Sequence, residues 1–165
     1  MSQTLELREN EIEEIRKRLQ SYLDEEMFKR EDRLFKTYTF RLDGQTQNID
    51  KQDNYTIYKA VHSGDENLKK LACKVITTCT YAHFMKYFVD VVGNTNITHE
   101  DKEDAVQTFF GEYLSRVIDA YDPDKGGLIN YLDYSARTVF RNYKAKRMEP
   151  HLNRLSQIPT GSYRL

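Results

Sequence analysis

The chain has 165 residues, of which 39% are apolar and 31% charged, and its net charge is −1. This is enough for one domain with a hydrophobic core, and too apolar for a disordered chain. The chain has two cysteines and no CxxC pair, which argues against a disulfide scaffold and against a zinc site. The first ten residues are polar and no apolar run approaches the ~20 residues of a membrane span, so we expect a cytoplasmic protein.

The N-terminal segment, residues 1–36, is predicted to contain one long helix, from Leu5 to Phe35. Apolar residues recur every three or four positions between Leu5 and Phe35, and charged residues fill the other positions. Such a helix buries a narrow stripe, either on its own domain or on a partner protein.

A connector, residues 37–64, follows. Alternating polar and apolar residues over Thr37–Leu42 predict a short strand, and the following Asp43-Gly44 is typical of a β-hairpin turn. The polar stretch Gln45–Asn54 is predicted to be a loop, and Tyr55–His62 fits a helix or a strand. The fold class is therefore mainly α, with a short β-hairpin as an option.

Residues 65–147 are predicted to form a helical domain of three helices, and residues 148–165 a C-terminal tail. Gly93 ends the first of these helices, Thr98 and Asp101 form a capping box for the second, and Asp122-Pro123 ends the second. The expected bounds of the helices are Glu66–Val92, His99–Tyr121 and Leu128–Arg147.

Charge is distributed unevenly within this domain. Residues 97–124 contain eight acidic and two basic residues, a net charge of −6, and residues 125–147 contain one acidic and six basic residues, a net charge of +5. Two neighbouring segments of opposite sign indicate two kinds of partner surface, unless both are simply solvated helix faces.

The turn between the last two helices resembles part of a calcium-binding EF-hand loop. Its candidate ligands are Asp122, Asp124, Asn130 and Asp133. Two positions depart from the loop pattern: Gly126 brings no side-chain oxygen, and Asp133 stands where a bidentate Glu is normal. Calcium binding is a weak alternative for this stretch.

A longer resemblance covers about 45 residues, from Glu103 to Arg147. The stretches EDAVQTFF, RVIDAYDPDKGG and LINYLDYSARTVFRNYKAKR follow one another, and they are similar in order and type to conserved region 2 of the sigma-70 family of RNA polymerase promoter-specificity factors. The family pattern is EDLVQ-x-x-F, then FDP-x-x-G, then F-x-x-WL-x-x-IAR. Here the interval from Gln107 to Asp122 is one residue longer than in the commonest family pattern, and Tyr131 replaces the usual Trp.

The resemblance implies a role in transcription initiation. It implies that Glu103, Asp104 and Gln107 bind the clamp coiled coil of a bacterial-type RNA polymerase, and that the last helix captures the opened −10-type promoter element. Eighteen residues follow Arg147, too few for the helix-turn-helix domain that reads the upstream element. The expectation is a truncated sigma limited to region 2, of the phage-late or ECF-like type, phage or bacterial in origin.

The residues of the last helix suit that role physically. An aromatic ring among cations follows one stripe at spacings of four and three. Cations hold phosphates, and an exposed ring stacks on an unpaired base, worth ~1–3 kcal/mol. Tyr131 lies between this stripe and the core face, which is expected to comprise Leu128, Leu132, Ser135 and Val139. The candidate DNA-binding residues are Asn130, Tyr131, Tyr134, Arg137, Arg141, Lys144, Lys146 and Arg147.

No motif for catalysis is present, because the four histidines fall in separate elements without a triad, an HExxH pair or a phosphate loop. We therefore expect no enzymatic activity, no cofactor and no membrane partner. The alternative to the sigma-like reading is a helical adaptor that binds polymerase or another protein through its N-terminal helix.

Overall fold

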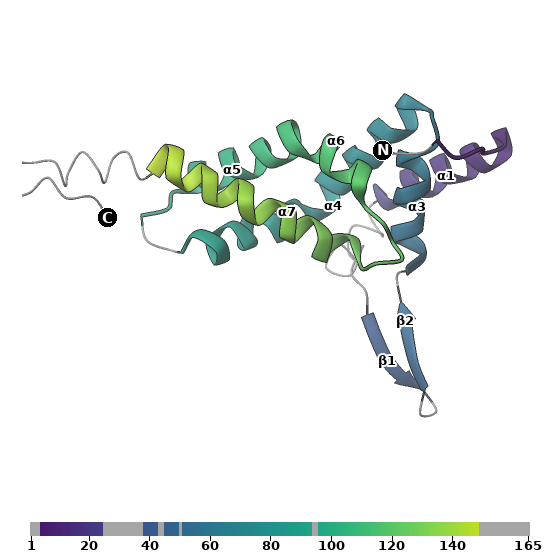
Figure 1. The fold of residues 1–165 in the computed structure, drawn as a ribbon, viewed down its shortest axis with the longest axis horizontal. Helices are drawn as coiled ribbons and strands as arrows, with labels where there is room; N and C mark the ends of the chain where they lie inside the picture. Colours follow the sequence, from purple (N-terminus) through teal and green to yellow (C-terminus); the bar gives the residue numbers. More distant parts are fainter. Residues whose placement is uncertain (1–3, 25–37, 43–44, 50, 94–95, 149–165) are drawn as a thin grey trace, which may run out of the picture.

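The computed structural model describes residues 4–24, 38–42, 45–49, 51–93 and 96–148. The fold is mainly helical, as predicted, and a two-stranded hairpin projects away from the helical body (Figure 1). The predicted tail lies outside the described residues except for Met148.

Helix α4 (Glu66–Val92) is the central element, and its predicted bounds are confirmed. The Asp65 side chain accepts hydrogen bonds from the amides of Asn67 and Leu68, which satisfies two donors of the first turn. At the other end Gly93 has φ 87°, a conformation that favours glycine. With 27 residues, α4 is about 40 Å long and contacts helices at both of its ends (Figure 1).

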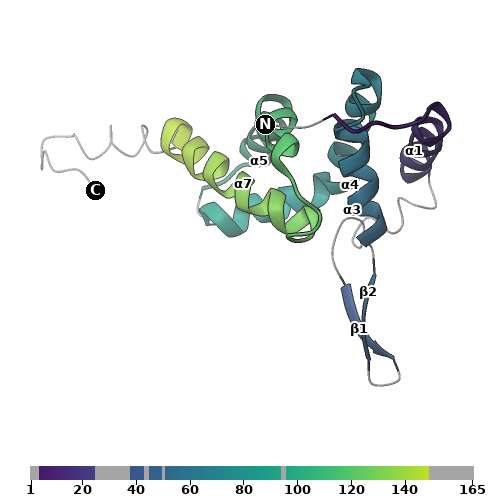
Figure 2. The same ribbon diagram turned by 45° about the vertical axis from the view of Figure 1, so that its right-hand side comes forward.

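Helices α1 (Glu9–Tyr22) and α3 (Lys51–Val61) pack on the N-terminal half of α4 (Figure 2). The prediction that the first helix begins at Leu5 is wrong, because the Leu5 amide donates instead to the carbonyl of His62 over 2.7 Å. The buried stripe of α1 is confirmed and consists of Ile15, Leu19 and Tyr22. The remainder of the predicted helix, residues 25–36, lies outside the described residues.

Strands β1 (Tyr38–Leu42) and β2 (Gln45–Ile49) form an antiparallel hairpin, which confirms that option. The loop predicted over Gln45–Asn54 is wrong, since this stretch forms β2 and the first turn of α3. The prediction failed because β2 is defined by its backbone pairing with β1, whereas its sequence QTQNI has no alternation of polar and apolar residues. The segment Tyr55–His62, for which two structures were open, is helical in α3 up to Val61.

The segment from His99 to Ala120 is helical but not one α-helix. It comprises α5 (His99–Thr108), the π-helical η1 (Phe109–Tyr113), α6 (Leu114–Val117) and the 3₁₀ turn η2 (Ile118–Ala120). The predicted capping box of Thr98 and Asp101 is present. A π turn holds more residues than an α turn, so η1 accommodates an additional residue without breaking the helix.

Helix α7 (Leu128–Tyr143) continues into the π-helical η3 (Lys144–Met148), close to the predicted bounds. The predicted core face is wrong at Ser135, which is half-buried and donates to the Tyr131 carbonyl over 3.3 Å. Ala136 lies near the middle of the buried face, because that face is centred between Leu128 and Ile129 and not on Leu128, and this places Ser135 at its edge. The buried residues are Leu128, Ile129, Leu132, Ala136, Val139, Phe140 and Tyr143.

Aromatic rings join α4, η1 and α7 in the C-terminal half of the core. The centroids of Phe84 and Phe109 are 5.4 Å apart, and those of Phe88 and Phe140 are 5.2 Å apart. These four side chains are fully buried. The described helices include none with the length and apolarity that a membrane span requires.

Candidate functional site

The stripe predicted on α7 is largely exposed. Asn130, Tyr134, Arg137 and Arg141 are all exposed, and the helix buries its opposite face against α4 and α5. Tyr134 is 77% exposed, and it is the large apolar side chain that stands free among those that the structure describes. The exposed Tyr134 ring thus shares one helix face with the guanidinium groups of Arg137 and Arg141. Its exposure shows that packing of the described fold does not account for a ring at this position.

A cavity of about 340 Å³ lies beside Tyr134 at the turn that precedes α7. Tyr134 and Asn130 lie on its α7 side, and Lys125 lies on the turn. Two further rings, Tyr121 and Tyr131, also line the cavity. A concave, partly aromatic surface beside an exposed ring and a cation can hold a planar, hydrogen-bonding group.

Tyr121 and Tyr131 are fixed by the fold and form the structural part of this cavity. Their ring centroids are 5.2 Å apart. The Tyr131 hydroxyl donates to the Val117 carbonyl over 2.6 Å, and the Tyr121 hydroxyl donates to the Gly126 carbonyl over 2.8 Å. Burial raises the pKa of both hydroxyls, so both stay protonated and keep donating at neutral pH. Of the two roles open to Tyr131, a core ring or a stacking ring, its half-buried position corresponds to the first.

Arg137 is held in a small network between α7 and α4. Its Nε donates to the Tyr87 hydroxyl over 3.3 Å, and the Tyr87 ring lies parallel to the ring of His83 at 6.0 Å. His83 Nε2 is 2.6 Å from Asp133 Oδ1, which ties α4 back to α7. These contacts orient the exposed guanidinium of Arg137 without burying it.

The remaining predicted cations are placed differently from one another. Lys144 is half-buried, and its Nζ donates to the carbonyl of Val92, the last residue of α4, over 3.1 Å. This ammonium therefore satisfies an acceptor at a helix C-terminus. Lys146 is exposed, and Arg147 lies in η3.

The predicted polymerase-binding residues lie on α5. Gln107 and Asp104 are exposed, and Asp104 Oδ2 accepts a hydrogen bond from the Tyr143 hydroxyl over 2.9 Å. Glu103 is half-buried and its Oε1 is 2.8 Å from His99 Nε2. Within the described residues, Gln107 is the one of the three whose side chain makes no hydrogen bond or ion pair inside the fold.

The candidate calcium ligands do not gather around one point. Asp133 faces His83, Asp124 accepts a hydrogen bond from the Tyr55 hydroxyl, and Asp122 Oδ1 accepts one from the Asp124 amide over 2.9 Å. In the part of the chain that the structure describes, no three His, Cys, Asp or Glu side chains are grouped so as to hold a metal ion.

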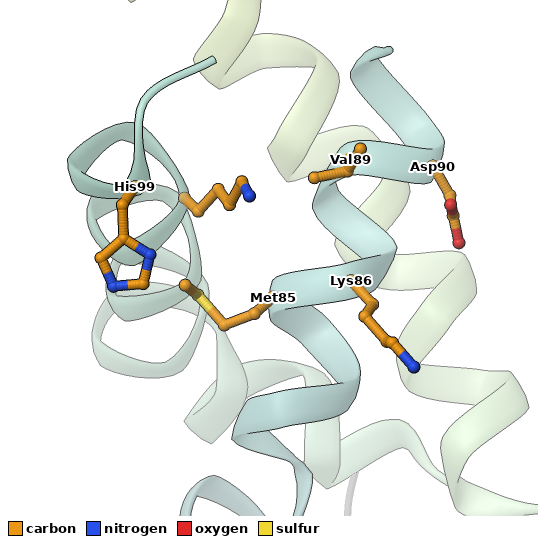
Figure 3. A pocket seen from close by; sticks show the side chains of 6 residues that line it. Met85, Lys86, Val89, Asp90 and His99 are labelled. Atoms are coloured by element: carbon orange, nitrogen blue, oxygen red, sulfur yellow. The ribbon is translucent and has the colours of Figure 1, made fainter. Parts of the chain in front are cut away.

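A second, larger hollow of about 650 Å³ lies between α4 and the start of α5 (Figure 3). Met85 and Val89 of α4 provide its apolar surface, and His99 lies across from them. Lys86, Asp90 and Lys102 complete the lining. Glu103 lies beside this groove, because its carboxylate contacts His99, which lines the groove. The groove shares no lining residue with the cavity beside Tyr134.

Sequence reasoning missed the contribution of α3 to the turn before α7. Asn54 Oδ1 accepts a hydrogen bond from the Leu128 amide over 3.4 Å, and Tyr55 donates to the Asp124 carboxylate. The sequence did contain one signal for this contact, which is the glycine at the N-cap position of α7. Because glycine has no side chain to accept a hydrogen bond, an acceptor for the first turn must come from another part of the chain. The partner lies 74 positions away in the sequence and no local pattern identifies it.

No known protein family, curated protein or solved structure matches the chain.

Proposed function

We propose that the chain is a sigma-like promoter-specificity subunit. It binds the clamp of a bacterial-type RNA polymerase through α5 and captures the opened −10-type promoter strand through α7, while the chemistry belongs to the polymerase. The observation that carries the proposal is the exposed Tyr134 beside a tyrosine-lined cavity, on the same helix face as Arg137 and Arg141.

The arrangement supports capture of a single strand. A melted strand presents phosphates at regular intervals and bases that have lost their stacking partners. Two guanidinium groups spaced by one helical turn can neutralise phosphates, while an exposed ring accepts an unstacked base. Because double-stranded DNA offers no free base faces, this combination favours an opened promoter over a closed one.

The π turn η1 supports the resemblance on which the proposal rests. The interval from Gln107 to Asp122 is one residue longer than in the commonest pattern of the sigma-70 family, and η1 lies inside that interval, at Phe109–Tyr113. A π turn takes up an inserted residue locally, so the helix before it and the turn after it keep their relative positions. The extra residue is thus compatible with a region 2 arrangement of α5 and α7.

The test separates DNA capture from polymerase binding. Arg137→Glu with Arg141→Glu is expected to weaken binding of an opened promoter oligonucleotide by the polymerase complex at least tenfold at low salt. The slope of log affinity against log salt should also fall by about 1.5, because two phosphate contacts are lost. Tyr134→Ala should cost about 5- to 100-fold while Tyr134→Phe keeps the affinity, because stacking needs the ring and not the hydroxyl. Co-purification with core polymerase should survive these changes and be lost in Gln107→Lys.

Lys70→Glu with Lys74→Glu is the matched control, since both lysines are exposed on α4 at the same spacing of four. This variant carries the same charge change, so an equal loss of DNA binding would indicate a general charge effect and contradict the proposal. Unchanged DNA binding in the Arg137 and Arg141 variant, with polymerase binding retained, would favour a helical adaptor instead.

A further inference from the structure

Helix α7 begins at a residue that cannot cap it. Gly127 occupies the N-cap position and has no side chain to accept a hydrogen bond from the first turn. Gly127 and Leu128 are both buried, so water does not reach the Leu128 amide. A buried amide without an acceptor is unfavourable, and the fold must supply one.

Asn54 supplies that acceptor from α3. Its side chain is 2% exposed, and its Oδ1 lies 3.4 Å from the Leu128 amide nitrogen. Asparagine is among the strongest N-cap residues when it is local, and here the same amide oxygen acts across 74 residues of sequence. The start of α7 is therefore fixed to α3 by a buried polar contact.

A second contact joins the same two parts. The Tyr55 hydroxyl donates to the Asp124 carboxylate, three residues before the N-cap of α7. Helix α3 is itself held on α1, because the Tyr22 hydroxyl donates to Asp53 Oδ1 over 2.6 Å. Consecutive residues of α3 thus connect α1 on one side with the turn on the other.

We propose that Asn54 is a positioning residue for strand capture: by capping α7 from α3, it fixes the first turn of α7 and the cavity that Asn130 and Tyr134 line. The functional half of this inference rests on the proposed function, and the structural half does not. Without the cap, the first turn of α7 opens more often, and the wall of the cavity is lost in that fraction of molecules.

The experiment uses the full chain and two measurements. Asn54→Ala is expected to make amide hydrogen exchange in the first turn of α7 about five- to tenfold faster, while exchange in α4 is unchanged. The same variant should weaken binding of an opened promoter oligonucleotide by the polymerase complex about twofold or more. Asn54→Asp keeps the capping oxygen but adds a charge at a position that is 2% exposed, next to the buried Asp53, so it should restore the slow exchange only in part.

Asn67→Ala is the matched control, since Asn67 lies in the first turn of α4 but is exposed. Unchanged exchange in α7 of Asn54→Ala would overturn the inference. Faster exchange in Asn54→Ala with unchanged DNA affinity would overturn only the functional half of the inference. If Arg137→Glu with Arg141→Glu does not weaken DNA binding, the proposed function itself is contradicted. If Asn54→Ala does not fold, Asn54→Ser is measured in the same way, because it keeps a polar group but shortens the side chain that reaches the Leu128 amide, and unchanged exchange at the start of α7 would overturn the inference equally.

Discussion

A buried carboxylate joins α1 to α3. Asp53 is 6% exposed, and its Oδ1 accepts a hydrogen bond from the Tyr22 hydroxyl over 2.6 Å. Arg18 completes the group, since its Nε donates to the Tyr22 oxygen over 2.9 Å and its guanidinium is 3.6 Å from Asp53. A buried charge is tolerated only when it is paired and hydrogen-bonded, so the tyrosine hydroxyl is a necessary part of this group.

Removal of that hydroxyl tests the contact at the level of one atom. Tyr22→Phe keeps the ring but removes this hydrogen bond to the buried Asp53, and we expect a loss of about 1–3 kcal/mol in the free energy of unfolding at pH 7. Urea denaturation measures this loss. Tyr58→Phe, another half-buried tyrosine of the same region, is the control and should change the free energy by much less.

The stabilisation by Tyr22 should also depend on pH. Burial, followed by the hydrogen bond to Asp53, raises the pKa of Tyr22 to about 12, above its ordinary value near 10. The folded chain therefore retains a proton that the unfolded chain releases. The stabilisation is complete below pH 10 and is lost as the pH rises from 10 to 12, at up to about 1.4 kcal/mol per pH unit. The difference between the unaltered chain and Tyr22→Phe should shrink over that interval, and a constant difference would refute the assignment.

Two glycines in helical segments have opposite roles. Gly93 ends α4 with φ 87°, where a side chain is strained, whereas Gly111 lies inside η1 without a positive φ. A Cβ at either position would meet no atom within 4 Å, so backbone conformation alone decides the effect. We expect Gly93→Ala to lower the free energy of unfolding by about 1 kcal/mol, and Gly111→Ala to raise it by about 0.5–1 kcal/mol, with melting temperatures that shift in the same directions. Equal shifts of the same sign in thermal unfolding would contradict this account.

The elements that the sequence predicts well are those with local signals. The bounds of α4 follow from Asp65 and Gly93, which lie next to its ends, and the capping box of α5 lies within four residues. The start of α1 could not be predicted in this way, because it depends on a hydrogen bond between Leu5 and His62. Local chemistry therefore sets most helix ends, and contacts between distant residues set the exceptions.

The same division holds within the candidate site. Periodicity places Tyr134, Arg137 and Arg141 on an exposed face of α7, as predicted. Periodicity does not show that Lys144 donates to Val92 at the end of α4, or that Tyr131 donates to Val117. These contacts remove the two side chains from the free stripe, and both depend on how α7 packs against the preceding helices.

The whole molecule is organised around one shared helix. The N-terminal half of α4 packs against α1 and α3, and its C-terminal half packs against α5 and α7 (Figure 2). The buried residues of both halves belong to one continuous cluster, which includes Leu19 of α1 and Phe84 of α4. Because a helix that loses half of its packing surface is only marginally stable, the two halves should not unfold separately.

Leu19→Ala and Phe84→Ala test this cooperativity, since both side chains are fully buried, one in each half. We expect losses of about 2–5 and 3–5 kcal/mol respectively, which are large fractions of the 5–15 kcal/mol typical of a domain. Each variant should still unfold in one transition, seen at the same midpoint by helix content and by tyrosine environment. Gln20→Ala, on the exposed face of α1, is the control. If Leu19→Ala splits the transition in two, α1 and α3 form an independent unit, and they could then hold the α7 turn only while they are folded themselves.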